Sequence, residues 1–156
     1  VQLAAAMSVS GRPESSELVD GLLKRDLPPA LRSVCLNLRA WQCYLAGDDA
    51  LRAEADQASL DAITASPDND SFIDTRGHVL LWNKRWSEAE QHFRRAFKLT
   101  KARSTSASAA SGLAMICAAT NRADEAAEWL ARARENDSEH VLVARATAAV
   151  EPLRRL

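Results

Sequence analysis

The chain has 156 residues, enough for one domain with a continuous core, and no apolar run approaches the roughly 20 residues that a helix needs to cross a bilayer. Its net charge of −1 gives no general attraction to nucleic acid or to membranes, so we expect neither as a partner. The three cysteines are odd in number, and Cys35 and Cys43 are too far apart on one expected helix to form a bridge. We therefore expect no disulfide framework and a reducing, cytoplasmic setting.

Apolar periodicity, turn residues and caps predict an all-α chain of about eight helices. The first eleven residues have the composition of a helix end closed by Gly11, which would suit a chain cut from a longer protein. A capping box of Ser87 and Glu90 is expected to start the fifth helix, and a polar joint at 104–106 to precede the sixth. The predicted helices are Glu14–Arg25, Ala30–Ala46, Ala50–Ala65, Ser71–Asn83, Ser87–Lys101, Ala107–Ala119, Asp124–Arg134 and Ser138–Val150.

Two segments of the chain match each other at one fixed offset. Residues 86–98 read WSEAEQHFRRAFK, and residues 123–135 read ADEAAEWLARARE, 37 residues later. Both place a large apolar residue between two alanines, in the order Ala89, Phe93, Ala96 in the first segment. Repetition of a small–large–small order in one register is typical of stacked helical repeats, in which small side chains let two helix backbones approach closely.

These residues resemble the tetratricopeptide repeat (TPR) family, whose unit is a helix–turn–helix of about 34 residues. The best match is the repeat at 70–103, followed by the repeat at 107–138, although neither has the closing proline of the family. The stretch 30–67 matches as a degenerate repeat, with Ser59 in place of the aromatic residue. The resemblance implies one right-handed solenoid of antiparallel helix pairs over 1–156, with 1–29 and 139–156 as capping segments.

In TPR proteins the first helix of each pair lines a concave groove that holds a peptide or a helix of a partner protein. Carried over to this chain, the resemblance implies a groove formed by Asp74, His78, Leu81, Trp82, Ser111 and Met115. None of these is a Lys or Asn that could clamp a terminal carboxylate, so the groove suits an apolar or mildly basic segment. The alternative is that Leu81 and Trp82 pack against the neighbouring repeat and that His78 lies in the interior.

No catalytic constellation, metal-ligand spacing or cofactor loop stands out, so we expect a non-catalytic module that binds a protein or peptide, with no metal and no cofactor. The basic residues Arg94, Lys98 and Lys101 share one helix face, which we expect to be a solvated convex surface. Two alternatives remain open. The apolar segments VQLAAAMSV and VLVARATAAV near the ends could support self-assembly into a homo-oligomer, or the chain could be a regulatory arm of a larger multidomain protein.

Overall fold

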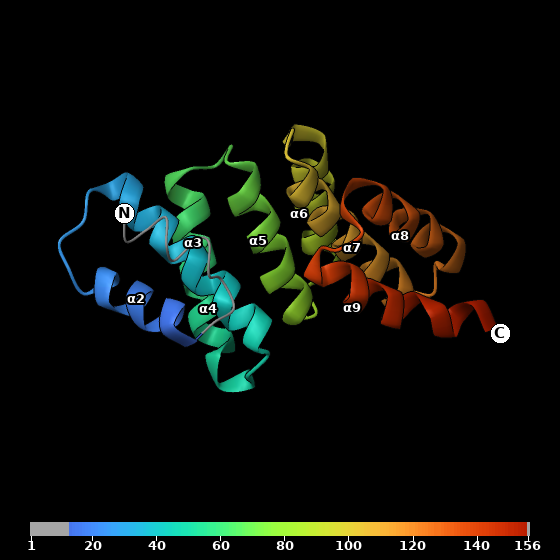
Figure 1. Ribbon diagram of the computed structural model, residues 1–156, viewed down its shortest axis with the longest axis horizontal. Coiled ribbons are helices and arrows are strands. Elements are labelled where there is room, and N and C mark those ends of the chain that lie inside the picture. The colour runs from blue at the N-terminus through green and yellow to red at the C-terminus, as the bar shows by residue number, and fades with distance from the viewer. Residues whose placement is uncertain (1–12, 156) are drawn as a thin grey trace.

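The computed structural model describes residues 13–155 (Figure 1). These residues form eight α-helices and two short 3-10 segments, with no strand among them, which confirms the all-α class. None of the described helices is long and apolar enough to cross a membrane. The expected helix end at Gly11 lies outside the described residues. The α-helices are α2 (Pro13–Leu23), α3 (Pro29–Ala46), α4 (Arg52–Ala65), α5 (Asp70–Trp82), α6 (Trp86–Leu99), α7 (Arg103–Ala119), α8 (Ala123–Asp137) and α9 (Val141–Val150).

Three predicted boundaries are wrong by three or more residues, and one of them is the end of α8, which lies at Asp137 rather than Arg134. The expected polar joint at 104–106 is the first turn of α7, where the Ser106 amide already donates to the Ala102 carbonyl at 3.0 Å. A serine cluster without Gly or Pro does not interrupt the backbone, and serine is well tolerated in a first helical turn. The last helix starts at Val141 rather than Ser138, because the His140 side chain caps it by accepting from the Leu142 amide.

The expected capping box is also wrong. The helix α6 starts at Trp86, and its N-cap residue Arg85 makes no side-chain cap. The Glu90 carboxylate accepts hydrogen bonds from Arg94 and Arg122 instead of turning back to the start of the helix. The local capping interaction does not form, because Glu90 instead makes charge-assisted hydrogen bonds, one of them to the next helix pair. Hydrogen bonds between ionised groups are the stronger kind.

The helices pack as antiparallel pairs, α3 with α4, α5 with α6 and α7 with α8, while α2 covers α3 and α9 covers α7 and α8 (Figure 1). Helices α3, α5, α7 and α9 also contact each other in sequence, and we call them the first-helix layer. The two ends of this layer meet. Arg145 of α9 donates to the Leu45 carbonyl of α3 at 2.9 Å, and its guanidinium lies 5.2 Å from the centre of the Tyr44 ring.

The main core lies between α5, α6, α7, α8 and α9. Its centre is Phe93 of α6, whose buried ring sits against Gly77 of α5 and Gly112 of α7. A Cβ atom at Gly112 would lie 2.4 Å from that ring, and one at Gly77 would lie 2.7 Å from it. The repeated alanines beside Phe93 and Leu130 are fully buried, as the small–large–small order predicts. The close approach of three helices therefore depends on a large ring facing two residues without side chains.

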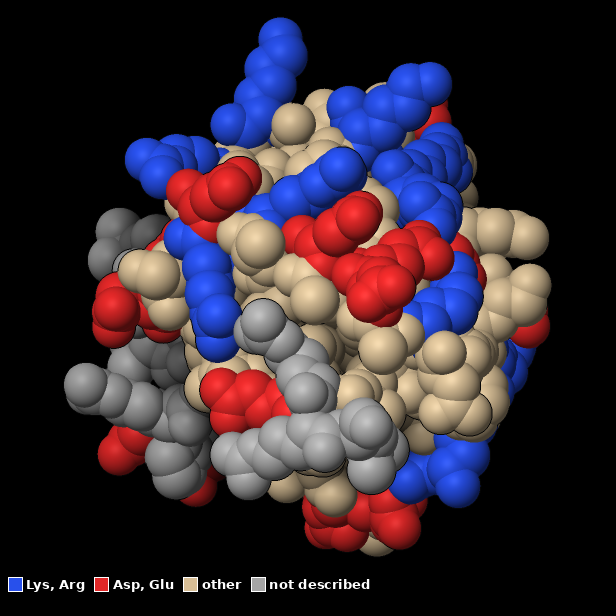
Figure 2. All heavy atoms as spheres, turned by 90° about the vertical axis from the view of Figure 1, so that its right-hand side faces the viewer, with Lys and Arg blue, Asp and Glu red and all other residues tan. Residues whose placement is uncertain are grey.

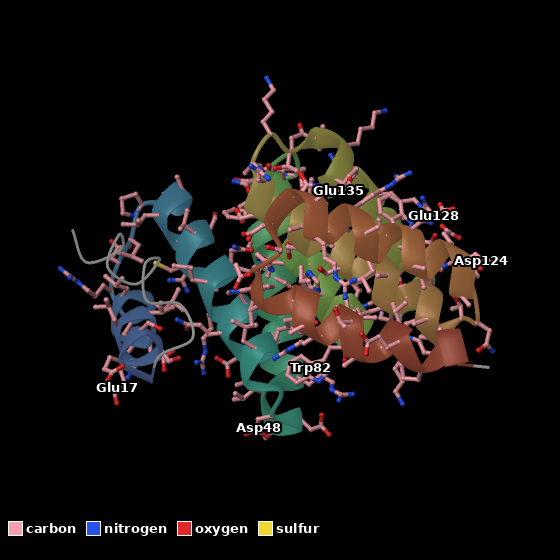
Figure 3. The ribbon with its side chains drawn as sticks, turned by 45° about the vertical axis from the view of Figure 1, so that its right-hand side comes forward. Glu17, Asp48, Trp82, Asp124, Glu128 and Glu135 are labelled. Carbon is pink, nitrogen blue, oxygen red and sulfur yellow. The ribbon has the colours of Figure 1, made fainter. Side chains whose placement is uncertain are left out.

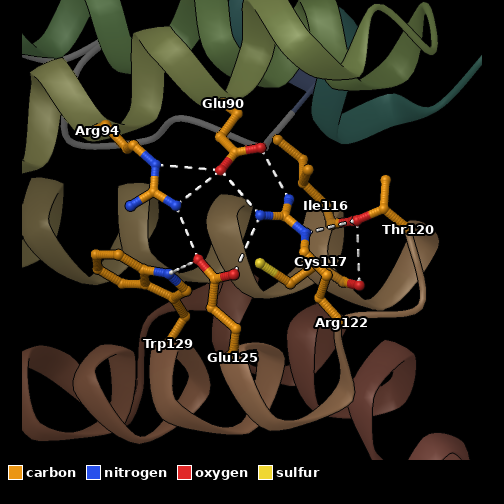
Figure 4. Close-up of polar contacts among 8 residues, drawn as sticks. All are labelled: Glu90, Arg94, Ile116, Cys117, Thr120, Arg122, Glu125 and Trp129. Atoms are coloured by element: carbon orange, nitrogen blue, oxygen red, sulfur yellow. Dashed lines mark hydrogen bonds and ion pairs between the residues drawn. The ribbon is translucent and has the colours of Figure 1, made fainter.

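A cluster of four charged residues joins the second and third helix pairs (Figure 4). Glu90 accepts from Arg94 at 2.7 Å and from Arg122 at 2.8 Å, and Glu125 accepts from the same two arginines at 2.8 and 3.1 Å. We call this group the Glu90 cluster. Arg94, the first of the three basic residues that the sequence places on one helix face, is thus a partner of two carboxylates. Figure 2, which shows the end of the molecule with α8 and α9, has acidic and basic side chains side by side rather than in one basic field.

Candidate binding pocket in the first-helix layer

A pocket of about 310 Å³ opens among the helices of the first-helix layer. Its walls come from three consecutive first helices and from the cap residue of the fourth. Most of the side chains that line it are polar, and Asp74 is the only carboxylate among them. They are Asn37, Leu38 and Trp41 of α3, Ser71, Asp74 and Thr75 of α5, Ser104, Thr105 and Ser108 of α7, and His140 before α9.

The stacking of the first helices brings these residues together. Asn37 and Ser71 are 34 residues apart, the length of one family repeat. The next repeat follows at an offset of 37, so Ser108 is the counterpart of Ser71, and Asp74 meets Ser108 rather than its own counterpart Ser111, which lies three residues further along α7. Polar side chains on three adjacent first helices therefore produce a polar pocket in the middle of an apolar stack.

At the inner wall of the pocket, Asp74, Ser108 and His78 form a buried chain of polar contacts. Ser108 Oγ lies 2.6 Å from Asp74 Oδ2 and 3.0 Å from His78 Nε2, and the latter lies 3.6 Å from Asp74 Oδ1. When Asp74 is ionised, Ser108 donates to it and His78 Nε2 must donate to Ser108. In that state the histidine cannot act as a base toward Ser108.

Aromatic rings enclose the far side of His78. The ring centres of Phe93, Tyr44 and Trp41 lie 4.5, 5.0 and 5.6 Å from that of His78. Burial among these rings lowers the pKa of His78 well below its usual value, and burial raises the pKa of Asp74 to about 8 against the opposing effect of the Ser108 hydrogen bond. Both groups are therefore held in their neutral forms by the loss of hydration, since a low-dielectric surrounding disfavours charge.

Several polar atoms in this region lack a hydrogen-bond partner. They include Asp74 Oδ1 and Asn37 Oδ1 at the pocket and His78 Nδ1 behind it. Buried polar atoms are normally paired, because an unpaired one costs about 1–3 kcal/mol. Asn37 and Asp74 both line the pocket, and each has one oxygen to which no described group donates. No group of three or more metal-binding side chains occurs within residues 13–155.

Comparison with known proteins adds a sequence match and a fold match. Residues 69–139, which span α5 to α8, match the tetratricopeptide repeat family. The fold also resembles the crystal structure of TTC0263, a thermophilic TPR protein of Thermus thermophilus, with a TM-score of 0.64 and 20% identity over 88% of this chain and 72% of that one. No curated protein matches the chain in sequence.

The TPR arrangement places the six residues of the expected groove in different surroundings. Asp74 lines the pocket, whereas His78 and Ser111 are wholly buried behind it. The partly buried Leu81 and Met115 pack against the main core, and Trp82, at the end of α5, packs against α3 and α4 (Figure 3). The guanidinium of Arg52 lies 5.2 Å from the Trp82 ring centre. The structure thus brings Asp74 and His78 together. Ser111 lies in the interior, and Leu81, Trp82 and Met115 lie toward the carboxyl-terminal ends of α5 and α7.

The expected TPR groove does not include Asn37, Trp41 or His140, all of which line the pocket. The sequence does contain a signal for Asn37, because it lies one repeat length before Ser71. Trp41 and His140 have no such signal. They reach the pocket because α3 and the start of α9 close its two sides, which is a property of the assembled layer.

Proposed function

We propose that this TPR chain is a protein-interaction module that holds a segment of a partner protein in the pocket of the first-helix layer. The observation that supports it is the pair of unpaired acceptor oxygens, on Asn37 and Asp74, in a pocket shared by four helices. The volume of about 310 Å³ is at the lower end of the range for ligand sites and suits one or two side chains of a peptide rather than a large cofactor. TPR domains in general are protein-interaction modules, which agrees with this proposal.

The proposed mechanism is binding to a surface that exists before the partner arrives. Helices packed on both sides fix the pocket walls, so little conformational entropy is lost when a segment enters. One side chain of the partner fills the pocket at Asp74, and the segment continues along the layer toward the partly exposed Leu81, Trp82 and Met115. His78 and Ser111 support the wall from behind and do not contact the partner.

Selection from random peptides displayed on phage, with the full chain as bait, tests this proposal. Ser71 is exposed at the pocket, and Ser71→Trp should block entry and weaken the selected peptides by about tenfold or more, which is about 1.4 kcal/mol. Ser87→Trp is the matched control, because Ser87 is likewise exposed on α6 and lies outside the pocket. If no peptide is selected, or if both variants bind alike, the pocket is not a peptide site.

Self-assembly is the second candidate, and one exposed residue favours it. Val141 at the start of α9 is 52% exposed and borders a shallow hollow along that helix. The other large apolar residues of α9, Leu142, Val143 and Val150, are buried against the chain itself, which reduces what is left for a second copy. Sedimentation velocity at several concentrations decides this candidate: a concentration-dependent mass that Val141→Glu abolishes would support it.

A further inference from the structure

The chemistry of the pocket indicates which kind of group it binds, an inference that rests on the proposed function. We propose that the pocket takes a positively charged N–H donor, an ammonium or guanidinium group, which donates to the carboxylate of Asp74 and to the amide oxygen of Asn37. Lysine and arginine side chains and a chain's N-terminal amine all carry such a group.

The first argument is hydrogen-bonding capacity. A carboxylate can accept about four hydrogen bonds, and Asp74 receives one, from Ser108. The Asn37 side-chain oxygen receives none. Both side chains are more than nine-tenths buried, so bulk water does not satisfy these oxygens freely. An ammonium has three N–H donors and a guanidinium has five, and neither has an acceptor, so these groups complement a site with spare acceptors.

The second argument is charge. No Lys or Arg is among the described residues that line the pocket, so an anionic group would find no opposite charge there. A cation would pair with Asp74 once that carboxyl has released its proton. Trp41 supplies an aromatic wall, and tryptophan is the side chain that attracts cations most strongly through its ring.

The starts of α5 and α7 border the pocket, and a free helix N-terminus favours anions. At α5, side chains of the chain itself already accept hydrogen bonds from two of the free backbone amides. The Asn69 side chain accepts from the Phe72 amide at 3.1 Å, and the carboxylate of Asp70 accepts from the Ser71 amide at 3.0 Å. The negative charge of Asp70 adjoins the site, which disfavours a second anion and favours a cation.

Binding of a cation should be linked to release of a proton. Burial raises the pKa of Asp74 to about 8, so the empty pocket holds a protonated carboxyl at pH 7, and a bound cation favours the ionised form. Below pH 8 each bound cation therefore displaces about one proton, and affinity should rise by up to about tenfold per pH unit. The other titratable or charged groups that face this site are Tyr44 of α3, Asp70 and His78 of α5, and His140 and Arg145 of α9, while α7 faces it with Ser108.

Small probes test the proposal without a partner. The full chain, labelled with ¹⁵N, is titrated with n-butylammonium, ethylguanidinium, n-butanol and butyrate, and amide shifts around Asp74, Asn37 and Thr105 are followed by NMR. We expect saturable shifts with the two cations, stronger at pH 7.5 than at pH 5.5. We expect a loss of about 10- to 100-fold in affinity in Asp74→Asn, which keeps the shape and removes the charge.

The control variant is Asp124→Asn, an exposed acid of α8 outside the pocket, which should leave the titrations unchanged. Equal or stronger shifts with butanol or butyrate would overturn the assignment of a cation. The absence of saturable shifts with every probe would overturn it too, as would full retention of cation binding in Asp74→Asn. None of these outcomes affects the peptide selection, so failure of the cation assignment is distinguishable from failure of the proposed function.

Discussion

At the scale of single residues, the fold depends on Phe93 lying between two glycines. Gly112→Ala places a Cβ atom 2.4 Å from a buried ring, so the ring or the helices must shift. Overpacking of this kind costs about 1–3 kcal/mol, and alanine returns about 1 kcal/mol of helix propensity. We predict a net loss of up to about 2 kcal/mol in the free energy of unfolding, measured by urea denaturation.

The control for this prediction is Gly21→Ala in α2, where a Cβ atom would meet nothing within 4 Å. That variant should gain about 0.5–1 kcal/mol, because only the difference in helix propensity remains. Adding Phe93→Leu to Gly112→Ala should recover part of the loss by shortening the opposing side chain. If Gly112→Ala is as stable as Gly21→Ala, the close approach is not what requires a glycine.

A second prediction at this scale concerns Asp74. Its pKa is about 8 in the folded chain and near 3.8 when unfolded, so the folded state keeps a proton that the unfolded state loses. The contribution of this group to stability is therefore fully present below about pH 4 and is lost as pH rises toward 8. Relative to Asp74→Asn, the wild type should lose up to about 1.4 kcal/mol per pH unit over that range.

Urea denaturation of both chains between pH 6.5 and 8 gives the clearest measurement. Burial lowers the pKa of His78 from its unfolded value of 6.5, so this residue contributes a slope near pH 6.5, but the slope is common to both chains and cancels in their difference. A pH-independent difference between the two chains would show that the carboxyl of Asp74 is ionised in the folded state at neutral pH.

At the scale of the helices, substitutions in the Glu90 cluster measure how much this cluster contributes to holding adjacent helix pairs together. Its side chains are 22–47% exposed, so each ion pair should contribute about 0.5–1 kcal/mol, less at high salt. We predict that Glu90→Gln lowers stability by about 1 kcal/mol at low ionic strength. Glu128→Gln is the control, because Glu128 lies exposed on the outer side of α8 and forms no ion pair with the described residues (Figure 3).

The same cluster gives a pH dependence of defined sign. The hydrogen bond from Arg122 holds the pKa of Glu90 below its usual 4.5. Its stabilising effect is therefore fully present above about pH 4.5 and is lost as pH falls through the lower folded pKa. The stability difference between the wild type and Glu90→Gln should shrink in acid, and a difference that persists at about pH 2.5 would contradict the assignment to charge.

The helices and their pairing are predictable from the sequence because their signals are local. The repeated order of Ala89, Phe93 and Ala96 predicts the close packing that the structure shows. The capping box fails for a nonlocal reason, since Arg122 comes from another helix pair and takes the carboxylate of Glu90. The pocket is nonlocal too. Spacing relates Asn37 to Ser71, but nothing local indicates that Trp41 and His140 would close the same space.

At the scale of the whole molecule, contact between the ends of the first-helix layer has a measurable effect. Arg145 of α9 donates to the Leu45 carbonyl of α3, a contact across 100 residues of sequence. We predict that Arg145→Ala raises amide hydrogen exchange in both α3 and α9. Arg134→Ala is the control, because Arg134 of α8 bonds to Thr147 of α9 and its loss should leave exchange in α3 unchanged. Unchanged exchange in α3 would show that the end contact carries no coupling.

The bond between Arg145 and Leu45 also bears on how the chain folds. In a linear array of repeats each unit touches only its neighbours, so folding can start anywhere and spread one unit at a time. Here one hydrogen bond and one cation–π contact also join α3 and α9, the first and last helices of the first-helix layer. Forming this contact closes a long loop, and loop closure slows folding more than it changes stability. Local opening of α9 should therefore also loosen the carboxyl-terminal end of α3.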